Sequence, residues 1–181
     1  FIAEAIRLPS EAYLGDQMSI VDPDAIHDAR DRLQRVIGAQ LEPLWRDIHA
    51  RTASPEFLLT AAARGARKLR SMALVNLAAS GATDADDIAF AQFDSANNMT
   101  ERQAALGVLA SSKSDKRDAA LDIFYNRYAE DALVIDKWFQ TQALSFHPDT
   151  VKLVEQLAKH SDFTLTNPNR VRALYGAFAA N

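Results

Sequence analysis

The sequence predicts an all-α fold of stacked antiparallel helix pairs that form an irregular α-solenoid or superhelix. Five of the six prolines stand just before amphipathic segments, which is where helices begin. Between them apolar residues recur at i, i+3, i+4 and i+7, as in Val171, Leu174, Tyr175 and Phe178. No segment alternates apolar and polar residues as a half-buried strand does.

Each expected helix start carries a local signal. Proline suits the first helical position because its fixed φ fits and its missing N–H would be unpaired there anyway. Four prolines also follow a candidate N-cap: Asp22, Ser54, His147 and Asn167. Further starts are indicated at Thr83, Asn98, Ser114 and Asp131. Helices are therefore expected to begin near residues 22, 54, 83, 98, 114, 131, 147 and 167.

The stretch from Asp22 to about Arg51 contains Gly38 and Pro43, either of which can kink or divide a helix. We expect two helices or one bent helix there. No Gly-, Ser- or Pro-rich linker and no block of like charge interrupts the chain, so residues 1–181 are expected to form a single all-helical domain.

Alternate expected starts, such as 83 and 114 or 98 and 131, are roughly 31 to 36 residues apart, near the spacing of helical-hairpin repeats. This spacing favours stacked helix pairs. No consensus residues recur from one unit to the next, so an irregular helix bundle is the alternative.

The net charge and the cysteine count limit which partners and which cellular compartment are expected. A formal charge of −4 provides no excess of Lys and Arg for nucleic acid or an anionic membrane. The absence of cysteine excludes disulfides and thiolate metal sites, and no apolar run is long enough to cross a membrane. We expect a cytoplasmic protein. Because residue 1 is Phe and the chain stops directly after an apolar helix, both ends are expected to be cut from a longer protein.

No catalytic constellation is encoded. No histidine has a second one three or four residues away, as a helical zinc site would need. We expect surface or helix-capping roles for His147 and His160. There is no Gly-rich phosphate loop and no Gly-x-Ser-x-Gly nucleophile elbow. The chain is therefore predicted to have no catalytic residue and no metal ligand.

A polar stretch from Thr164 to Arg172 is the remaining candidate for a binding site. It brings amide and guanidinium groups to a helix N-terminus, which can attract a carboxylate or phosphate. Arg170 and Arg172 would lie about 200° apart around the helix, so they cannot serve the same site. The alternative is that both arginines are ordinary surface cations and that Asn167 and Asn169 only satisfy the first turn.

Four segments carry specific motifs: 96–100 (Ala-Asn-Asn-Met-Thr), 136–139 (Asp-Lys-Trp-Phe), 166–172 (Thr-Asn-Pro-Asn-Arg-Val-Arg) and 176–179 (Gly-Ala-Phe-Ala). In these segments, which occur in the family's order, and more weakly over essentially the whole chain, the sequence resembles the bacterial aminopeptidase N family of zinc exopeptidases.

The resemblance implies the last domain of such an enzyme, a helical superhelix that caps a thermolysin-like catalytic domain and helps to enclose the substrate cavity. The family's His-Glu-x-x-His and Gly-x-Met-Glu-Asn motifs are absent here, so zinc would be bound by residues outside this chain. The second arginine of the family's Asn-Pro-Asn-Arg-x-Arg word falls on Arg172, which implies a substrate-binding role. Asn169 is a further candidate for lining the cavity, Arg170 is expected to be structural, and the family's last helices would lie beyond Asn181.

The function predicted from this resemblance is a cap domain of a zinc aminopeptidase that removes N-terminal amino acids from peptides. The chain alone is expected to be inactive, and its partners would be the catalytic domain of the same polypeptide and peptide substrates. The alternative is a free-standing helical-repeat module that binds other proteins along a concave face.

Overall fold

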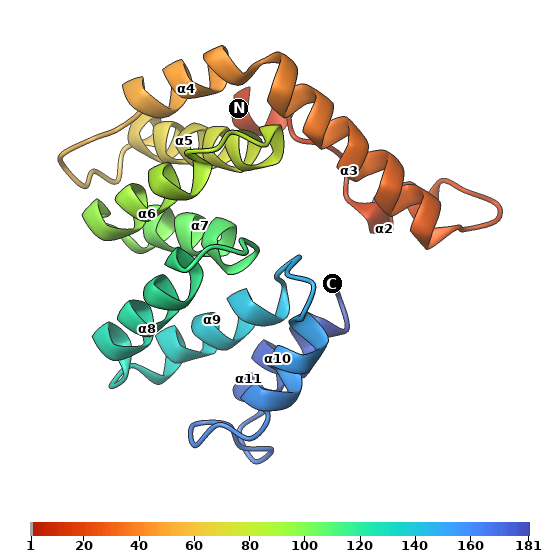
Figure 1. Cartoon of the computed structure of the whole chain (residues 1–181), viewed down its shortest axis with the longest axis vertical. Helices are drawn as coiled ribbons and strands as arrows, with labels where there is room; N and C mark the ends of the chain where they lie inside the picture. The colour runs from red at the N-terminus through yellow and green to blue at the C-terminus, as the bar shows by residue number, and fades with distance from the viewer. Residues whose placement is uncertain (1) are drawn as a thin grey trace. The chain divides into compact units, whose positions relative to one another are not determined.

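The structure is a computed structural model that describes residues 2–181. It confirms the all-α prediction, because these residues form eleven α-helices and one π-helix and contain no strand (Figure 1). None of the helices in the described part of the chain is both long enough and apolar enough to span a bilayer. The chain divides into two compact units, one ending at Ile88 and the other running from Ala89 to Asn181.

The first unit is built around one long helix, α5 (Ala61–Ser80). Short helices α1 (Ile2–Ala5) and α2 (Glu11–Asp16) precede α3 (Pro23–Gln40) and α4 (Glu42–Arg51). Helices α1, α3 and α4 all pack against α5. Leu41 separates α3 from α4 with a non-helical φ of −110° and ψ of 17°, and Pro43 lies in the first turn of α4. The stretch around Gly38 and Pro43 is thus two helices.

A small apolar cluster holds α4 on α5. Trp45 from α4 packs with Ala73 and Leu77 from α5, and Ile37, Ile48 and Ile88 pack around them. Next to this cluster, Arg46 forms a two-point ion pair with Asp84 at 2.7 and 2.9 Å. The hydrogen-bonded pairing with Arg46 lowers the pKa of Asp84 below its ordinary value. The pair therefore stabilises the unit at neutral pH, and this contribution falls as the pH drops through the lowered pKa.

The second unit is built around α9 (Ala132–Ala143). Helix α6 (Ala85–Ser95) leads from the first unit into it, followed by α7 (Met99–Ala110) and α8 (Lys116–Tyr128). After α9 come α10 (Thr150–Leu157), α11 (Pro168–Val171) and the π-helix η1 (Arg172–Gly176). Helices α7, α8, α10, α11 and η1 all contact α9. Its core residues Ile135 and Phe139 are almost completely inaccessible to solvent.

Four of the expected helix caps form as the sequence predicts. The side chains of Asp22, Asn98, Asp131 and Asn167 each accept a backbone N–H in the first turn of α3, α7, α9 and α11. The starts expected near 83 and 114 lie within two residues of Ala85 and Lys116, where α6 and α8 begin.

The start expected at Ser54 is wrong. The hydroxyl of Ser54 bonds the amide and the carbonyl of Glu56, which closes a local turn, and the helix begins only after Thr60. Arg67 of α5 holds the intervening segment by a hydrogen bond to the Leu58 carbonyl and by its contact with the Phe57 ring. Side-chain bonds two residues on compete with helix formation, which explains the later start.

The N-cap expected at His147 is also wrong, because Asp149 occupies that position of α10. The Nδ1 atom of His147 accepts the Asp149 amide, so this histidine forms the turn that leads into the helix.

Candidate functional site

The 166–172 segment forms a tight helical corner. Asn167 is extended and its Oδ1 accepts the backbone N–H groups of Asn169 and Arg170 at 3.0 and 3.3 Å. Pro168 occupies the first helical turn, where its missing N–H costs nothing. One turn later the backbone widens into the π-helix η1, which begins at Arg172. Single π-turns of this kind inside helices are frequent at functional sites.

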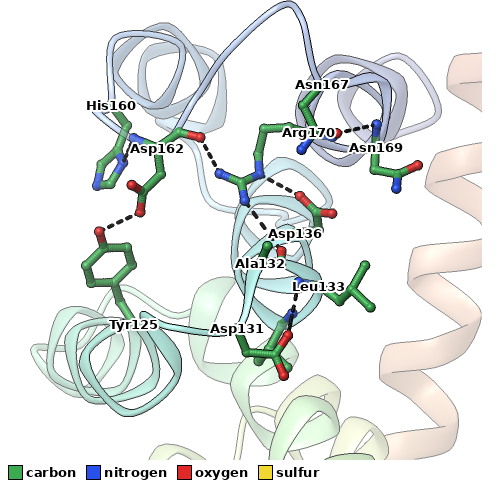
Figure 2. A network of polar contacts seen from close by, with 11 residues as sticks. Tyr125, Asp131, Ala132, Leu133, Asp136, His160, Asp162, Asn167, Asn169 and Arg170 are labelled. Carbon is green, nitrogen blue, oxygen red and sulfur yellow. Dashed lines mark hydrogen bonds and ion pairs between the residues drawn. The ribbon is translucent and has the colours of Figure 1, made fainter.

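Arg170 points inward from this corner and is 5% exposed. Its Nε donates to Asp136 Oδ1 at 2.5 Å, its Nη1 donates to the carbonyl of Asp162, and its Nη2 donates to the carbonyl of Ala132 (Figure 2). The guanidinium lies 4.8 Å from the centre of the Phe139 ring. A buried cation requires such compensation, and here α9 supplies most of it. Arg170 therefore has the structural role expected of it.

Asp136 and Asp162 are the partners that the sequence did not reveal. Asp136 stands directly after Ile135 and three residues before Phe139, on the side of α9 that faces the core. A carboxylate within such an apolar stripe implies a buried cation as its partner. This position in the stripe is the sequence feature from which the role of Asp136 could have been predicted. Asp162 lies in the loop before α11 and contacts Arg170 through its main-chain carbonyl, a contact that the residue type does not indicate.

Asp162 also connects this corner to α8. Its carboxylate accepts the hydroxyl proton of Tyr125 at 2.6 Å (Figure 2). This hydrogen bond, together with partial burial, raises the pKa of the Tyr125 hydroxyl above its ordinary value. The neutral tyrosine is thus favoured in the folded chain, so the stabilisation is present below the ordinary pKa and is lost as the pH rises through the raised pKa.

His160 is half-buried and packs in an aromatic cluster with Tyr125, Trp138 and Phe139. Its Nδ1 accepts the backbone N–H of Asp162, so His160 closes a local turn after α10, whose C-cap is Ala158, and the helix-capping role expected for it is wrong.

Replacing Tyr125 with phenylalanine is expected to lower the free energy of unfolding by about 1 kcal/mol at neutral pH, the usual net worth of one hydrogen bond. The variant should also lose less stability than the parent chain as the pH rises above about 10, because the group with the raised pKa is gone. Urea denaturation at a series of pH values measures both effects. If both proteins lose the same amount of stability at high pH, the hydrogen bond between Tyr125 and Asp162 is contradicted.

Arg172 and Asn169, the two residues selected from the sequence, lie together on the outside of the same corner. Both are exposed, and Arg172 Nη1 donates to Asn169 Oδ1 at 3.4 Å. Arg172 forms no ion pair with any residue of the described range 2–181, so its charge is available to a ligand. A guanidinium in this position can donate two parallel hydrogen bonds to a carboxylate or donate to peptide carbonyls. Arg170 and Arg172 do face different surroundings, as their angular separation predicts.

No three His, Asp or Glu side chains within residues 2–181 are grouped so that they could hold a metal ion. A zinc ion therefore does not fit a site made from these residues.

Comparisons with known proteins give a consistent result. A family model described as a domain of unknown function (DUF3458_C) with ARM repeats matches residues 1–181. Aminopeptidase N of Escherichia coli (strain K12) is 34% identical over 179 residues, which are 99% of this chain and 21% of the relative. Aminopeptidase N of Caulobacter vibrioides is 37% identical over 182 residues, with the same coverage. The chain thus spans about a fifth of the length of these curated relatives.

A solved structure has the same fold over nearly the whole chain. The crystal structure of Legionella pneumophila aminopeptidase A in complex with aspartic acid superposes with a TM-score of 0.87 at 28% identity. The match covers 99% of this chain and 22% of that one. The predicted stacking of helix pairs agrees with the ARM repeats of the family model.

Proposed function

The chain belongs to the DUF3458_C family of ARM repeats, and on that premise we propose that it is the cap domain of a zinc aminopeptidase that removes N-terminal amino acids from peptides. In this role the helices form a wall of the substrate cavity and Arg172 contributes a cation to it. The catalytic residues and the zinc ligands belong to other parts of the same polypeptide. Zinc would there activate the water that attacks the peptide bond. We further propose a cytoplasmic enzyme with peptides as substrates.

The observation that carries this proposal is the corner at 166–172. It keeps one arginine buried and presents a second, uncompensated one two residues later, beside the amide of Asn169. A protein that only needed the corner as a scaffold could place a neutral residue at 172. A cation held on the surface next to a hydrogen-bonding amide instead suits the carbonyl and carboxylate groups of a peptide.

The alternative, a free-standing helical-repeat module that binds proteins, has weaker support. ARM repeats are compatible with it. The curated relatives, however, carry the matching stretch within chains about five times as long, and both are aminopeptidases by name. That context favours the cap domain.

The proposal is tested with Arg172→Ala in the full-length enzyme. The variant should lower kcat/KM for a tripeptide by roughly tenfold to a hundredfold, as expected for loss of a hydrogen bond to a charged group, mainly through a higher KM. Hydrolysis of a small aminoacyl reporter, which has no further peptide groups, should change far less.

A matched control is Arg127→Ala, which removes an exposed cation from the last turn of α8 and should leave both substrates unaffected. Arg172→Lys should recover part of the loss, because it keeps the charge and lacks the planar fork. An equal effect of Arg172→Ala on tripeptide and reporter, or no effect on either, would refute the proposal.

A further inference from the structure

The buried pair between Asp136 and Arg170 joins two elements far apart in the chain. Asp136 belongs to α9 and Arg170 to α11, and their side chains are 15% and 6% exposed. The two other hydrogen bonds of the Arg170 guanidinium end on main-chain carbonyls, at Asp162 and Ala132. Asp136 is therefore the side chain that compensates the buried charge and fixes the direction of the guanidinium (Figure 2).

Arg170 and Arg172 share one short piece of backbone. The amide of Arg172 donates to the carbonyls of Pro168 and Asn169, which belong to the Asn167-capped turn. The π-helix starts two residues after Arg170, and its next residues, Ala173 and Leu174, are buried. The backbone at Arg172 is thus held on one side by Arg170 and on the other by Leu174, whereas its own guanidinium donates only to Asn169 among residues 2–181.

We propose that Asp136 is a positioning residue for the peptide-binding cation. By holding Arg170 against α9, it sets the place of the α11 corner and hence of the Arg172 guanidinium. This inference rests on the proposed function and adds a second residue to it, one that does not touch substrate. Misplacing a binding group by about 1 Å can lower an enzymatic rate by roughly a hundredfold, so anchoring of the corner has a measurable consequence.

Asp136→Asn is the appropriate change because the amide keeps the size and one acceptor oxygen and removes the charge. The neutral acceptor forms a weaker bond to the guanidinium than the carboxylate does. We expect the full-length enzyme with this substitution to show a KM for a tripeptide raised roughly tenfold, with kcat and the hydrolysis of a small aminoacyl reporter little changed.

The deciding experiment is a double-mutant cycle of Asp136→Asn and Arg172→Ala in the full-length enzyme, with kcat and KM measured for the tripeptide and the reporter. If Asp136 acts through Arg172, adding Asp136→Asn to Arg172→Ala should cause no further rise in KM. The same tenfold rise in both backgrounds would mean that Asp136 affects the site by another route and would overturn the inference. An unchanged tripeptide KM in Asp136→Asn, with Arg172→Ala still impaired, would overturn it and leave the proposed function intact. If Arg172→Ala has no effect on the tripeptide KM, both the positioning role of Asp136 and the proposed function are contradicted.

Two further variants guard against a general loss of structure. Asp84→Asn weakens a different ion pair, that with Arg46 in the first unit, and should leave the tripeptide KM unchanged. Asp136→Glu keeps the negative charge and should retain a KM closer to the parent value than Asp136→Asn does. A KM equally raised in Asp136→Glu and Asp84→Asn would indicate a nonspecific loss of folding and would count against positioning by Asp136.

Discussion

Replacing Arg170 with alanine is expected to lower the free energy of unfolding by about 3–5 kcal/mol, the range observed when one partner of a buried ion pair is removed. The change leaves the Asp136 carboxylate, 15% exposed, without its cation. It also strips the donors from the carbonyls of Asp162 and Ala132 and removes the cation above the Phe139 ring. Each of these losses lowers the free energy of unfolding, so the effect should be among the largest of any single substitution in the second unit.

Urea denaturation followed by circular dichroism measures this loss. Arg127→Ala, which removes an exposed arginine, should change the free energy of unfolding by no more than about 0.5 kcal/mol. The double variant Arg170→Met with Asp136→Leu should recover much of the stability, because an apolar pair of similar volume avoids the cost of burying charge. A loss below about 1 kcal/mol in Arg170→Ala would show that Asp136 finds water or another donor.

The helix starts were predictable because their signals are local. Asp22, Asn98, Asp131 and Asn167 cap helices through bonds that reach only two or three residues along the chain. Ser54 carries the same signal and fails, because its hydroxyl bonds both the amide and the carbonyl of Glu56 and closes a local turn instead. The choice between the two bonds depends on the contacts of the following segment with α5, and these arise only in the folded chain.

The candidate site was predictable only on its outer side. Arg172 and Asn169 were selected from the sequence and do lie together, because they share one turn of helix. The inner side depends on the Asp136 carboxylate and the Asp162 main-chain carbonyl, which lie 34 and 8 positions from Arg170 in the sequence. No periodicity links residues of different helices, so which carboxylate meets which cation is decided by how α9 and α11 pack.

The close contact at Gly38 is a backbone feature that the sequence alone did not predict. From the sequence it was a candidate kink, and the structure places it inside α3, shortly before the helix ends at Gln40. It is buried at the contact of α3 with α5, where a Cβ atom would lie 2.6 Å from the carbonyl oxygen of Asn76 and 2.9 Å from the amide nitrogen of Ser80. Both neighbouring atoms belong to backbone, so no side chain can move aside.

Gly38→Ala is therefore expected to lower the free energy of unfolding by about 1–3 kcal/mol or more, because α3 must move away from α5. Gly65→Ala is the matched control, since Gly65 lies in α5 and a Cβ atom added there would meet nothing within 4 Å. There alanine should raise the free energy of unfolding by about 0.5–1 kcal/mol through its better helix propensity.

The opposite signs make this comparison decisive, because both substitutions add one methyl group to a helical glycine of the first unit. Propensity alone would stabilise both variants, so any destabilisation of Gly38→Ala measures the steric cost of the helix contact. Urea denaturation of the two variants beside the parent chain gives that cost as a difference. Stabilisation by Gly38→Ala equal to that by Gly65→Ala would mean that α3 and α5 do not approach each other this closely at Gly38.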